Sequence, residues 1–381
     1  MRERLLAAWA GVAAVDHHCH PLRRPQRRIG AAELRSVFSE SLEPRQIAEH
    51  VPHTAVYRDA LRRLAAELAC DPTEAAVLEA RSRRDPAVHL GALLLRSGTG
   101  AMLLDRGVGL GAMDPEEHAR TVPVPQREVI RLETLAEALV PHCASVGEWL
   151  GAVRTELRRE VVARRAVAVK TIAAYRASLR LRPPDRAAAA ADYAELRRLA
   201  GRGEVRLQGD PLCHTLLLEA AEEVRRLELP LQVHCGIGDA DADLAETSPL
   251  GLRPLLGGGR VAGLRIVLLH CYPYHREAAY LCAVHADVHM DLSLALPQAG
   301  LDGSRAMRET LGLCPWTKLL YATDATALPE AYLVAAERHR EALAGALAEL
   351  VAAATLDEGE AVEVGRRVLA GNAAVLYRLE G

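Results

Sequence analysis

Eight short apolar runs, spread over the whole chain, each end on polar or charged side chains. In chain order the end residues are Asp16, His18 and His20 together, then Asp105, Glu133, Lys170, His234, His270, Ser293 and Asp324. Short apolar runs separated by helical stretches are typical of buried parallel strands in βα units. Eight such units predict an α/β fold, a (β/α)8 TIM barrel. The polar residues then lie at the carboxyl ends of the strands, where such barrels carry their chemistry.

An Arg-rich stretch with helical periodicity, residues 23–95, separates the first predicted strand from the second. Because the βα loops of a barrel surround its mouth, we expect this helical insertion to lie over the active site. One decorated barrel accommodates all 381 residues, so we predict a single domain over residues 1–381. A homodimer is expected only because it is the commonest oligomer.

Composition narrows the range of partners. The net charge of −3 argues against nucleic acid. No apolar run reaches the roughly 18 residues of a membrane span. The eight cysteines are scattered without paired spacing, which favours a reducing compartment, the cytoplasm, over a disulfide framework. The expected partner is therefore a small-molecule substrate.

Lysine is nearly absent from the chain. Of 47 basic residues only Lys170 and Lys318 are lysine. A general positive charge does not require lysine, because arginine supplies it with better-placed donors. An amine can, however, lose its proton when buried or be modified covalently. Lys170 is therefore predicted to be either a buried reactive amine or the parent of a modified ligand.

Histidines gather at the predicted strand ends. His18 and His20 are two residues apart on a strand, so both side chains point to the same side. Two imidazoles placed in this way form half of a metal site. His234, His270 and Asp324 each end another predicted strand and complete a nitrogen- and oxygen-rich cluster suited to zinc or a similar divalent ion.

These residues resemble the ligand set of the amidohydrolase superfamily of metal-dependent barrels. That family carries two histidines on strand one, a lysine on strand four, a histidine on strands five and six, and an aspartate on strand eight. The segments VKTIAAYR at 169–176, HCYPYHREA at 270–278, YATDA at 321–325 and GNA at 371–373 are similar to the amidohydrolase-2 branch. Within it, the chain most resembles the amidohydrolase portion fused to glutamine synthetase in nodulin-like proteins.

The resemblance implies a site with two zinc or similar divalent ions. His18, His20 and Asp324 would hold one ion, His234 and His270 the other, and a CO2-derived carbamate on Lys170 would bridge them. A bridging hydroxide would attack a carbonyl carbon. Asp324 would take a proton and pass it to the leaving amine. The resemblance also places His270 and Lys170 among the catalytic residues. If Lys170 is unmodified, a single ion is expected, and the lysine becomes a cation for a substrate carboxylate.

Four residues near the strand ends are candidate substrate contacts: Glu133, Tyr175, Arg176 and Arg276. An arginine at the mouth suits a carboxylate on the substrate. Glu133 is alternatively a ligand that replaces or supplements Lys170. We therefore expect a metal-dependent hydrolase of a C–N bond, an amide of γ-glutamyl type, in a small carboxylate-bearing substrate. The alternative is a mononuclear metal-dependent decarboxylase of the same branch.

Overall fold

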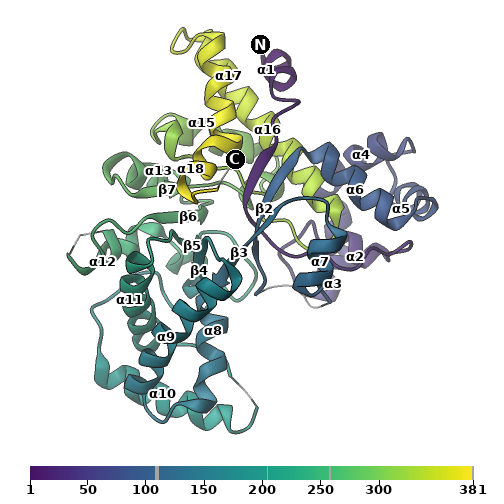
Figure 1. Cartoon of the computed structure of the whole chain (residues 1–381). Helices are drawn as coiled ribbons and strands as arrows, with labels where there is room; N and C mark the ends of the chain where they lie inside the picture. Colours follow the sequence, from purple (N-terminus) through teal and green to yellow (C-terminus); the bar gives the residue numbers. More distant parts are fainter. Residues whose placement is uncertain (108–110, 204, 257–258, 380–381) are drawn as a thin grey trace.

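The computed structural model describes the chain except residues 108–110, 204, 257–258 and 380–381 (Figure 1). Its centre is a parallel sheet whose seven strands follow one another in chain order. The strands are β1 (Ala14–Cys19), β2 (Thr99–Asp105), β3 (Gln126–Arg131), β4 (Ala168–Thr171), β5 (Leu231–Cys235), β6 (Ile266–His270) and β7 (Val288–Met290). β1, β4, β5 and β6 are buried along their whole length, which explains why they read as apolar runs without alternation.

The expected eighth strand, at residues 319–324, is not a regular strand in the described chain. Its neighbourhood still links the two edges of the sheet, because Leu320 N donates to Met290 O in β7 and Asp324 N donates to His18 O in β1. A continuous ladder does not form because the Asp16 side chain takes the Thr323 amide, at 3.0 Å, and Asp324 has a positive φ of 52°. The observed sheet therefore has seven strands instead of the eight predicted.

Helices occupy the connections and surround the sheet. They include α1 (Arg2–Ala8), α7 (Pro115–Thr121), α8 (Leu132–Leu139), α9 (Val146–Arg164), α10 (Arg186–Ala200), α11 (Asp210–Arg226), α12 (Arg253–Leu256), α13 (His275–Val284), α14 (Ala295–Gln298), α15 (Leu301–Leu311), α16 (Pro329–Ala352), α17 (Glu358–Arg366) and α18 (Asn372–Leu376). Their starts follow local capping rules. Ser145 caps α9, and Asp357 with Glu360 forms a capping box on α17.

The stretch between β1 and β2 is helical. It contains α2 (Ala31–Ser36), α3 (Pro44–Glu49), α4 (Ala55–Leu68), α5 (Glu74–Arg83) and α6 (Pro86–Ser97). An apolar cluster that includes Leu61, Leu93 and Leu333 packs α4 and α6 against α16, and Figure 1 shows α4 to α6 as a lobe beside the sheet. Beyond His20, the residues of this stretch that line the cavity described below are Ser36, Ser39, Glu40 and Leu42.

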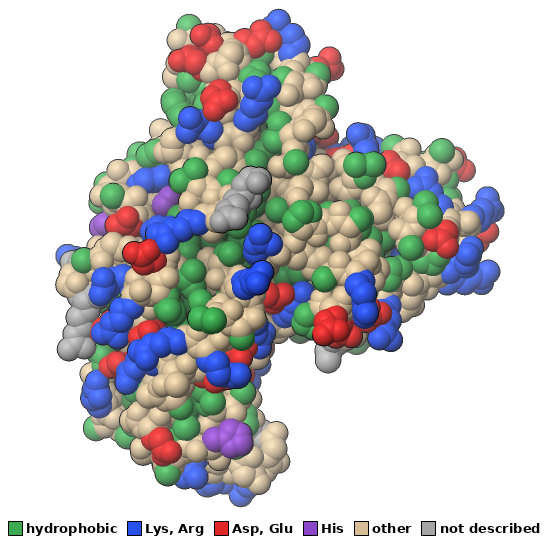
Figure 2. Space-filling view, in the orientation of Figure 1, with side chains coloured by type: hydrophobic (Ala, Val, Ile, Leu, Met, Phe, Trp, Pro, Cys, Tyr) green, Lys and Arg blue, Asp and Glu red, His purple; other side chains and the backbone are tan. Residues whose placement is uncertain are grey.

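The surface carries both signs of charge. On the face shown in Figure 2, lysine and arginine side chains are interspersed with aspartate and glutamate, without a continuous stripe of one sign. No helix in the described part of the chain combines the length and apolar character needed to span a membrane.

Candidate metal centre

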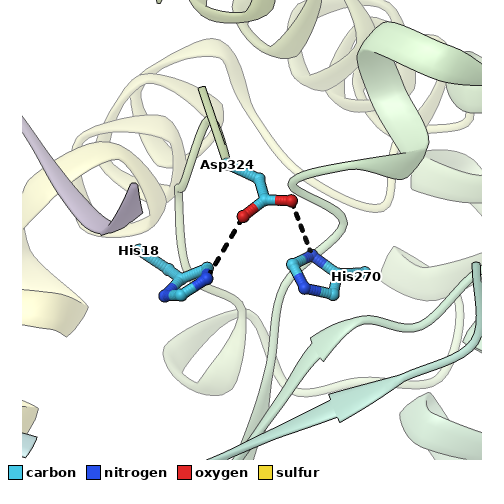
Figure 3. Close-up of side chains that lie close together, drawn as sticks. All are labelled: His18, His270 and Asp324. Atoms are coloured by element: carbon cyan, nitrogen blue, oxygen red, sulfur yellow. Dashed lines mark ion pairs between the residues drawn. The ribbon is translucent and has the colours of Figure 1, made fainter. Parts of the chain in front are cut away.

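Three histidine side chains, two from β1 and its end and one from β6, converge on one carboxylate. The Nε2 atoms of His18 and His20, on and just after β1, lie 3.1 and 3.2 Å from Asp324 Oδ1. His270 Nδ1, at the end of β6, lies 3.8 Å from Asp324 Oδ2. Figure 3 shows the Asp324 carboxylate between the rings of His18 and His270. His18, His270 and Asp324 form a group whose ligand atoms are close enough to hold one metal ion.

The protonation states of these side chains suit the binding of a metal cation. His18 and His270 are fully buried, and burial lowers the pKa of His18 to about 3 and also lowers the pKa of His270. Both imidazoles are therefore neutral and can offer lone pairs. Among the described residues, Asp324 Oδ1 and His270 Nε2 are buried atoms without a hydrogen-bond partner. Unpaired acceptors of this kind, from nitrogen and oxygen ligands, suit zinc or a similar divalent ion.

The backbone at two of these residues is held in an unusual conformation. His270 has φ 67° and Asp324 has φ 52°, in the left-handed region that side chains other than glycine seldom adopt. Asp291 Oδ1 accepts from His270 N at 2.7 Å, and Asp16 accepts from both the amide and the hydroxyl of Thr323. Backbone strain that the surroundings maintain in this way is concentrated at functional sites.

Lys170 lies beside His18, as a buried amine. Its Nζ is 2.9 Å from His18 Nε2 and 3.1 Å from Asp105 Oδ2. Asp105 also receives the Arg131 guanidinium, at 2.5 Å from Nη2. Burial lowers the pKa of Lys170, while the Asp105 carboxylate opposes that shift. His18, His20 and Asp105 form a second group that could hold an ion.

Sequence reasoning gave no role to Asp105 and missed Arg131. Asp105 was visible as a strand end. Arg131 was concealed because the third strand was expected to continue to Glu133, whereas β3 ends at Arg131.

His234 lies next to His270 but is not in either ligand group. The two ring centroids are 4.4 Å apart. His234 Nε2 is 3.0 Å from the carbonyl oxygen of Ile237, so this nitrogen carries the proton and donates it. The Tyr175 ring also lies against His234, with ring centroids 4.4 Å apart and an interplanar angle of 54°. A Cβ at Gly238 would lie 2.3 Å from the Tyr175 hydroxyl, so this close approach requires glycine.

A cavity of about 320 Å3 opens onto the site. His20, Lys170, His234, His270 and Asp324 line it, together with side chains from the surrounding loops. One loop residue, Glu40, comes from the stretch between β1 and β2 and was not predicted. Burial and then the negative charges of Asp324 and Asp239 raise the pKa of Glu40 to about 8. No local sequence signal marks Glu40, because the folding of that stretch brings it to the cavity.

Two of the four expected substrate contacts line the cavity, Tyr175 and Arg176. Arg176 Nε is buried without a hydrogen bond among the described residues, and the nearest carboxylate oxygen, in Glu137, is 4.0 Å away. An arginine with this unmet capacity can bind an anion at the cavity wall.

The other two expected contacts, Glu133 and Arg276, do not line the cavity. Glu133 belongs to α8 and accepts hydrogen bonds from Thr171 Oγ1 and Ile172 N, so it fixes the end of β4. Arg276 lies in the first turn of α13 at the surface, where its side chain is 63% exposed and pairs with Glu309. The strand-end pattern placed both near the mouth because it specifies chain position and not the direction of side chains on the following helix.

Comparisons with known proteins agree with the motif pattern. The amidohydrolase family model matches residues 15–379, which confirms the resemblance predicted from the sequence. Protein fluG of Emericella nidulans is 34% identical over 167 residues, which span 43% of this chain and 19% of fluG. The matched stretch thus covers about a fifth of that curated relative.

Solved structures share the fold. A crystal structure from Lactobacillus casei ATCC 334, described provisionally as a metal-dependent hydrolase, superposes with a TM-score of 0.87 at 30% identity and covers 98% of this chain and 97% of its own. The uronate isomerase of Thermotoga maritima matches with a TM-score of 0.67 at 14% identity, over 99% of this chain and 97% of its own. At that identity the second likeness concerns the fold alone.

Proposed function

The chain belongs to the amidohydrolase family, and from this membership we propose that it is a metal-dependent hydrolase of a C–N bond in a small, carboxylate-bearing amide of γ-glutamyl type. The observation that supports the proposal most is the convergence of two imidazoles on the Asp324 carboxylate, with His18 and His20 Nε2 at 3.1 and 3.2 Å from one oxygen. Residues 319–325 take the place of the eighth strand that would close a (β/α)8 barrel.

In this proposal His18, His20 and Asp324, with His270 beside them, hold a divalent ion, zinc by preference. A bound ion lowers the pKa of water to near neutral and so supplies a nucleophile. Asp324 accepts the proton and returns it to the leaving amine. His234 and Tyr175 form the adjacent wall and exclude water from one side of the substrate.

Arg176 holds the substrate carboxylate. Arg131 and Lys170 also line the cavity, but Asp105 already pairs with both. In the described part of the chain, no carboxylate lies closer to Arg176 than 4.0 Å. Its fork of N–H groups therefore has free capacity for a bidentate pair with a carboxylate.

A decarboxylase with a single ion is the second candidate, and one observation favours it. Lys170 Nζ lies 3.1 Å from Asp105 Oδ2, a pairing that stabilises an ammonium. A carbamate on Lys170 would place a second negative charge beside Asp105. An unmodified Lys170 would serve as a cation for the carboxylate that leaves as CO2.

The test is product analysis with zinc-loaded protein on a panel of small N-acyl and γ-glutamyl amides and on their parent acids. Amine release from amides supports the hydrolase. CO2 release from the acids, without amine release, contradicts it and favours the decarboxylase.

Elemental analysis of Lys170→Ala tests whether the site holds two ions bridged by a carbamate on Lys170 or one ion beside an unmodified lysine. Lys318→Ala is the matched control, because Lys318 binds backbone carbonyls away from the cavity. Two ions per chain in wild type and in the control, falling to one or fewer in Lys170→Ala, support the carbamate bridge. One ion in all three proteins contradicts the bridge.

A further inference from the structure

A chain of buried polar side chains connects His18 to His270 through residues that do not line the cavity. Its members are Gln232, Tyr377, His17, Asp291 and Ser293, each at most 3% exposed. They come from β5, the C-terminal segment, β1 and the segment after β7. The proposed chemistry assigns none of them a role, although every link is within hydrogen-bonding distance.

Gln232 fixes the proton position on His18. Its Nε2 is 2.9 Å from the His17 carbonyl oxygen and 3.0 Å from the Tyr377 hydroxyl. A carbonyl only accepts, so the amide nitrogen must face it, and Oε1 must face His18 Nδ1 at 3.1 Å. His18 therefore carries its proton on Nδ1, and Nε2 keeps its lone pair toward the site.

Tyr377, His17 and Asp291 continue the chain in one direction. His17 Nε2 lies 2.9 Å from Asp291 Oδ2, in a buried ion pair that lacks the alignment of a hydrogen bond. Because a carboxylate oxygen only accepts, Nε2 carries the proton and Nδ1 is the acceptor. The Tyr377 hydroxyl, 3.0 Å from His17 Nδ1, donates to it and accepts from Gln232. The Tyr377 ring also stacks on His17, with centroids 5.7 Å apart and an interplanar angle of 20°.

Ser293 fixes the proton position on His270, as Gln232 does on His18. The Ser293 hydroxyl donates to Asp291 Oδ1 at 2.8 Å, so its oxygen accepts from His270 Nδ1 at 2.7 Å. His270 is thereby also protonated on Nδ1. Its Nε2, the atom without a partner, is left as a lone-pair donor.

We propose that this chain sets two histidines of the metal centre, His18 and His270, as Nδ1–H tautomers by directing every donor toward the Asp291 carboxylate, and that the C-terminal segment serves the site by supplying Tyr377 as the central link. The inference rests on the proposed metal centre. Partners behind a ligating histidine fix its tautomer and orientation, and losing one costs about tenfold or more in metal affinity.

The C-terminal segment is tied down in a way that serves this link. Asn372 Nδ2, at the start of α18, donates to the carbonyls of Trp316 and Leu319 at 2.7 and 2.8 Å. Arg265 Nη1 donates to Leu376 O at 2.8 Å, immediately before Tyr377. These anchors hold the Tyr377 hydroxyl between His17 and Gln232.

The experiment compares Tyr377→Phe with Tyr321→Phe. Tyr321 is equally buried, but its hydroxyl has no hydrogen-bond partner among the described residues, so it controls for loss of a buried phenol oxygen. The dissociation constants of Zn2+ and Co2+ are measured by competition with a chromophoric chelator, and the visible spectrum of the Co2+ form is recorded. Circular dichroism and the thermal midpoint of the metal-free protein report folding.

We expect Tyr377→Phe to bind both ions about tenfold or more weakly, with a changed Co2+ spectrum, while Tyr321→Phe stays within about twofold of wild type. A lower thermal midpoint with unchanged ion affinity would reveal a merely structural role and overturn the inference.

Ser293→Ala tests the other end of the chain and substitutes if Tyr377→Phe does not fold. A larger dissociation constant for Zn2+ supports the inference, and an unchanged one overturns it. If wild type itself binds neither ion, the proposed metal centre fails. If wild type and both variants bind equally well, only the tautomer chain fails.

Discussion

The two sides of the cavity differ in how many of their polar atoms already have partners. On the ligand side, His18 Nδ1 is 3.1 Å from Gln232 Oε1 and His20 Nδ1 donates to the carbonyl oxygen of Asp105 at 2.8 Å. On the loop side, Arg176 Nε has no hydrogen bond in the described chain. Among the residues that the structure describes, Glu40 has one hydrogen-bond partner, the side-chain amide of Gln298 at 3.4 Å.

This difference distinguishes preorganisation from recognition. The ligand side is fixed by buried partners before anything binds, which is the condition for holding a reactive centre with little reorganisation. The loop side retains polar groups with unmet hydrogen-bonding capacity, which a substrate can satisfy. Changes on the ligand side should therefore abolish activity, and changes on the loop side should alter substrate preference.

The largest effect is expected for Asp324→Asn. The amide removes both the ligand charge and the proton acceptor, so we expect kcat/KM to fall by about 10^3-fold or more, with loss of bound metal. Asp71→Asn, at an exposed position between α4 and α5, is the control. Retention of both metal and activity in Asp324→Asn would contradict the claim that the ligand side holds the reactive centre.

Arg176→Ala should alter recognition alone. Loss of a charge-assisted pair worth about 1.5–3 kcal/mol corresponds to an increase of roughly 10- to 100-fold in KM for a carboxylate substrate. The metal content should not change. Arg276→Ala is the matched control, since Arg276 pairs with Glu309 at the surface. Equal KM values for the two variants would show that Arg176 does not contact the substrate.

Glu133→Gln should reduce stability and spare catalysis. The Glu133 carboxylate accepts two hydrogen bonds, from Thr171 and Ile172. The amide accepts them less well, so we expect a loss of about 1–2 kcal/mol in the free energy of unfolding, measured with urea. A changed metal content at unchanged stability would instead identify Glu133 as a ligand.

Glu40→Gln should change the pH dependence of stability in the metal-free protein. The pKa of Glu40 is raised to about 8 in the folded chain, so this group's contribution is fully present below about pH 4.5 and is lost as the pH rises to about 8. Thermal midpoints between pH 5 and 9 should fall less steeply in Glu40→Gln than in wild type. Superimposable profiles would show that Glu40 titrates as an ordinary surface carboxylate.

The sequence predicted the ligand side better than the loop side, for a physical reason. His18, His20 and Lys170 end apolar runs, and the carboxyl ends of parallel strands meet at one edge, so chain position alone brings such residues together. Arg276 and Glu133 also follow strands, but they begin helices, and their direction depends on helix packing. Glu40 reaches the cavity through the folding of a helical stretch, which has no period that marks a single residue.

Long-range partners lay outside sequence reasoning altogether. Gln232 and Tyr377 are 145 residues apart and form a hydrogen bond that no local pattern encodes. The eighth strand was predicted from an apolar run, yet Thr323 bonds to the Asp16 side chain where a regular strand would continue its ladder. In both cases tertiary contacts determine the outcome.

The most direct test of the account is anomalous diffraction at the zinc edge from crystals of zinc-loaded protein. The account predicts an anomalous peak about 2.0–2.2 Å from His18 Nε2, His20 Nε2 and an oxygen of Asp324. A peak confined to other residues, or none at these three atoms in zinc-saturated crystals, would contradict the central claim.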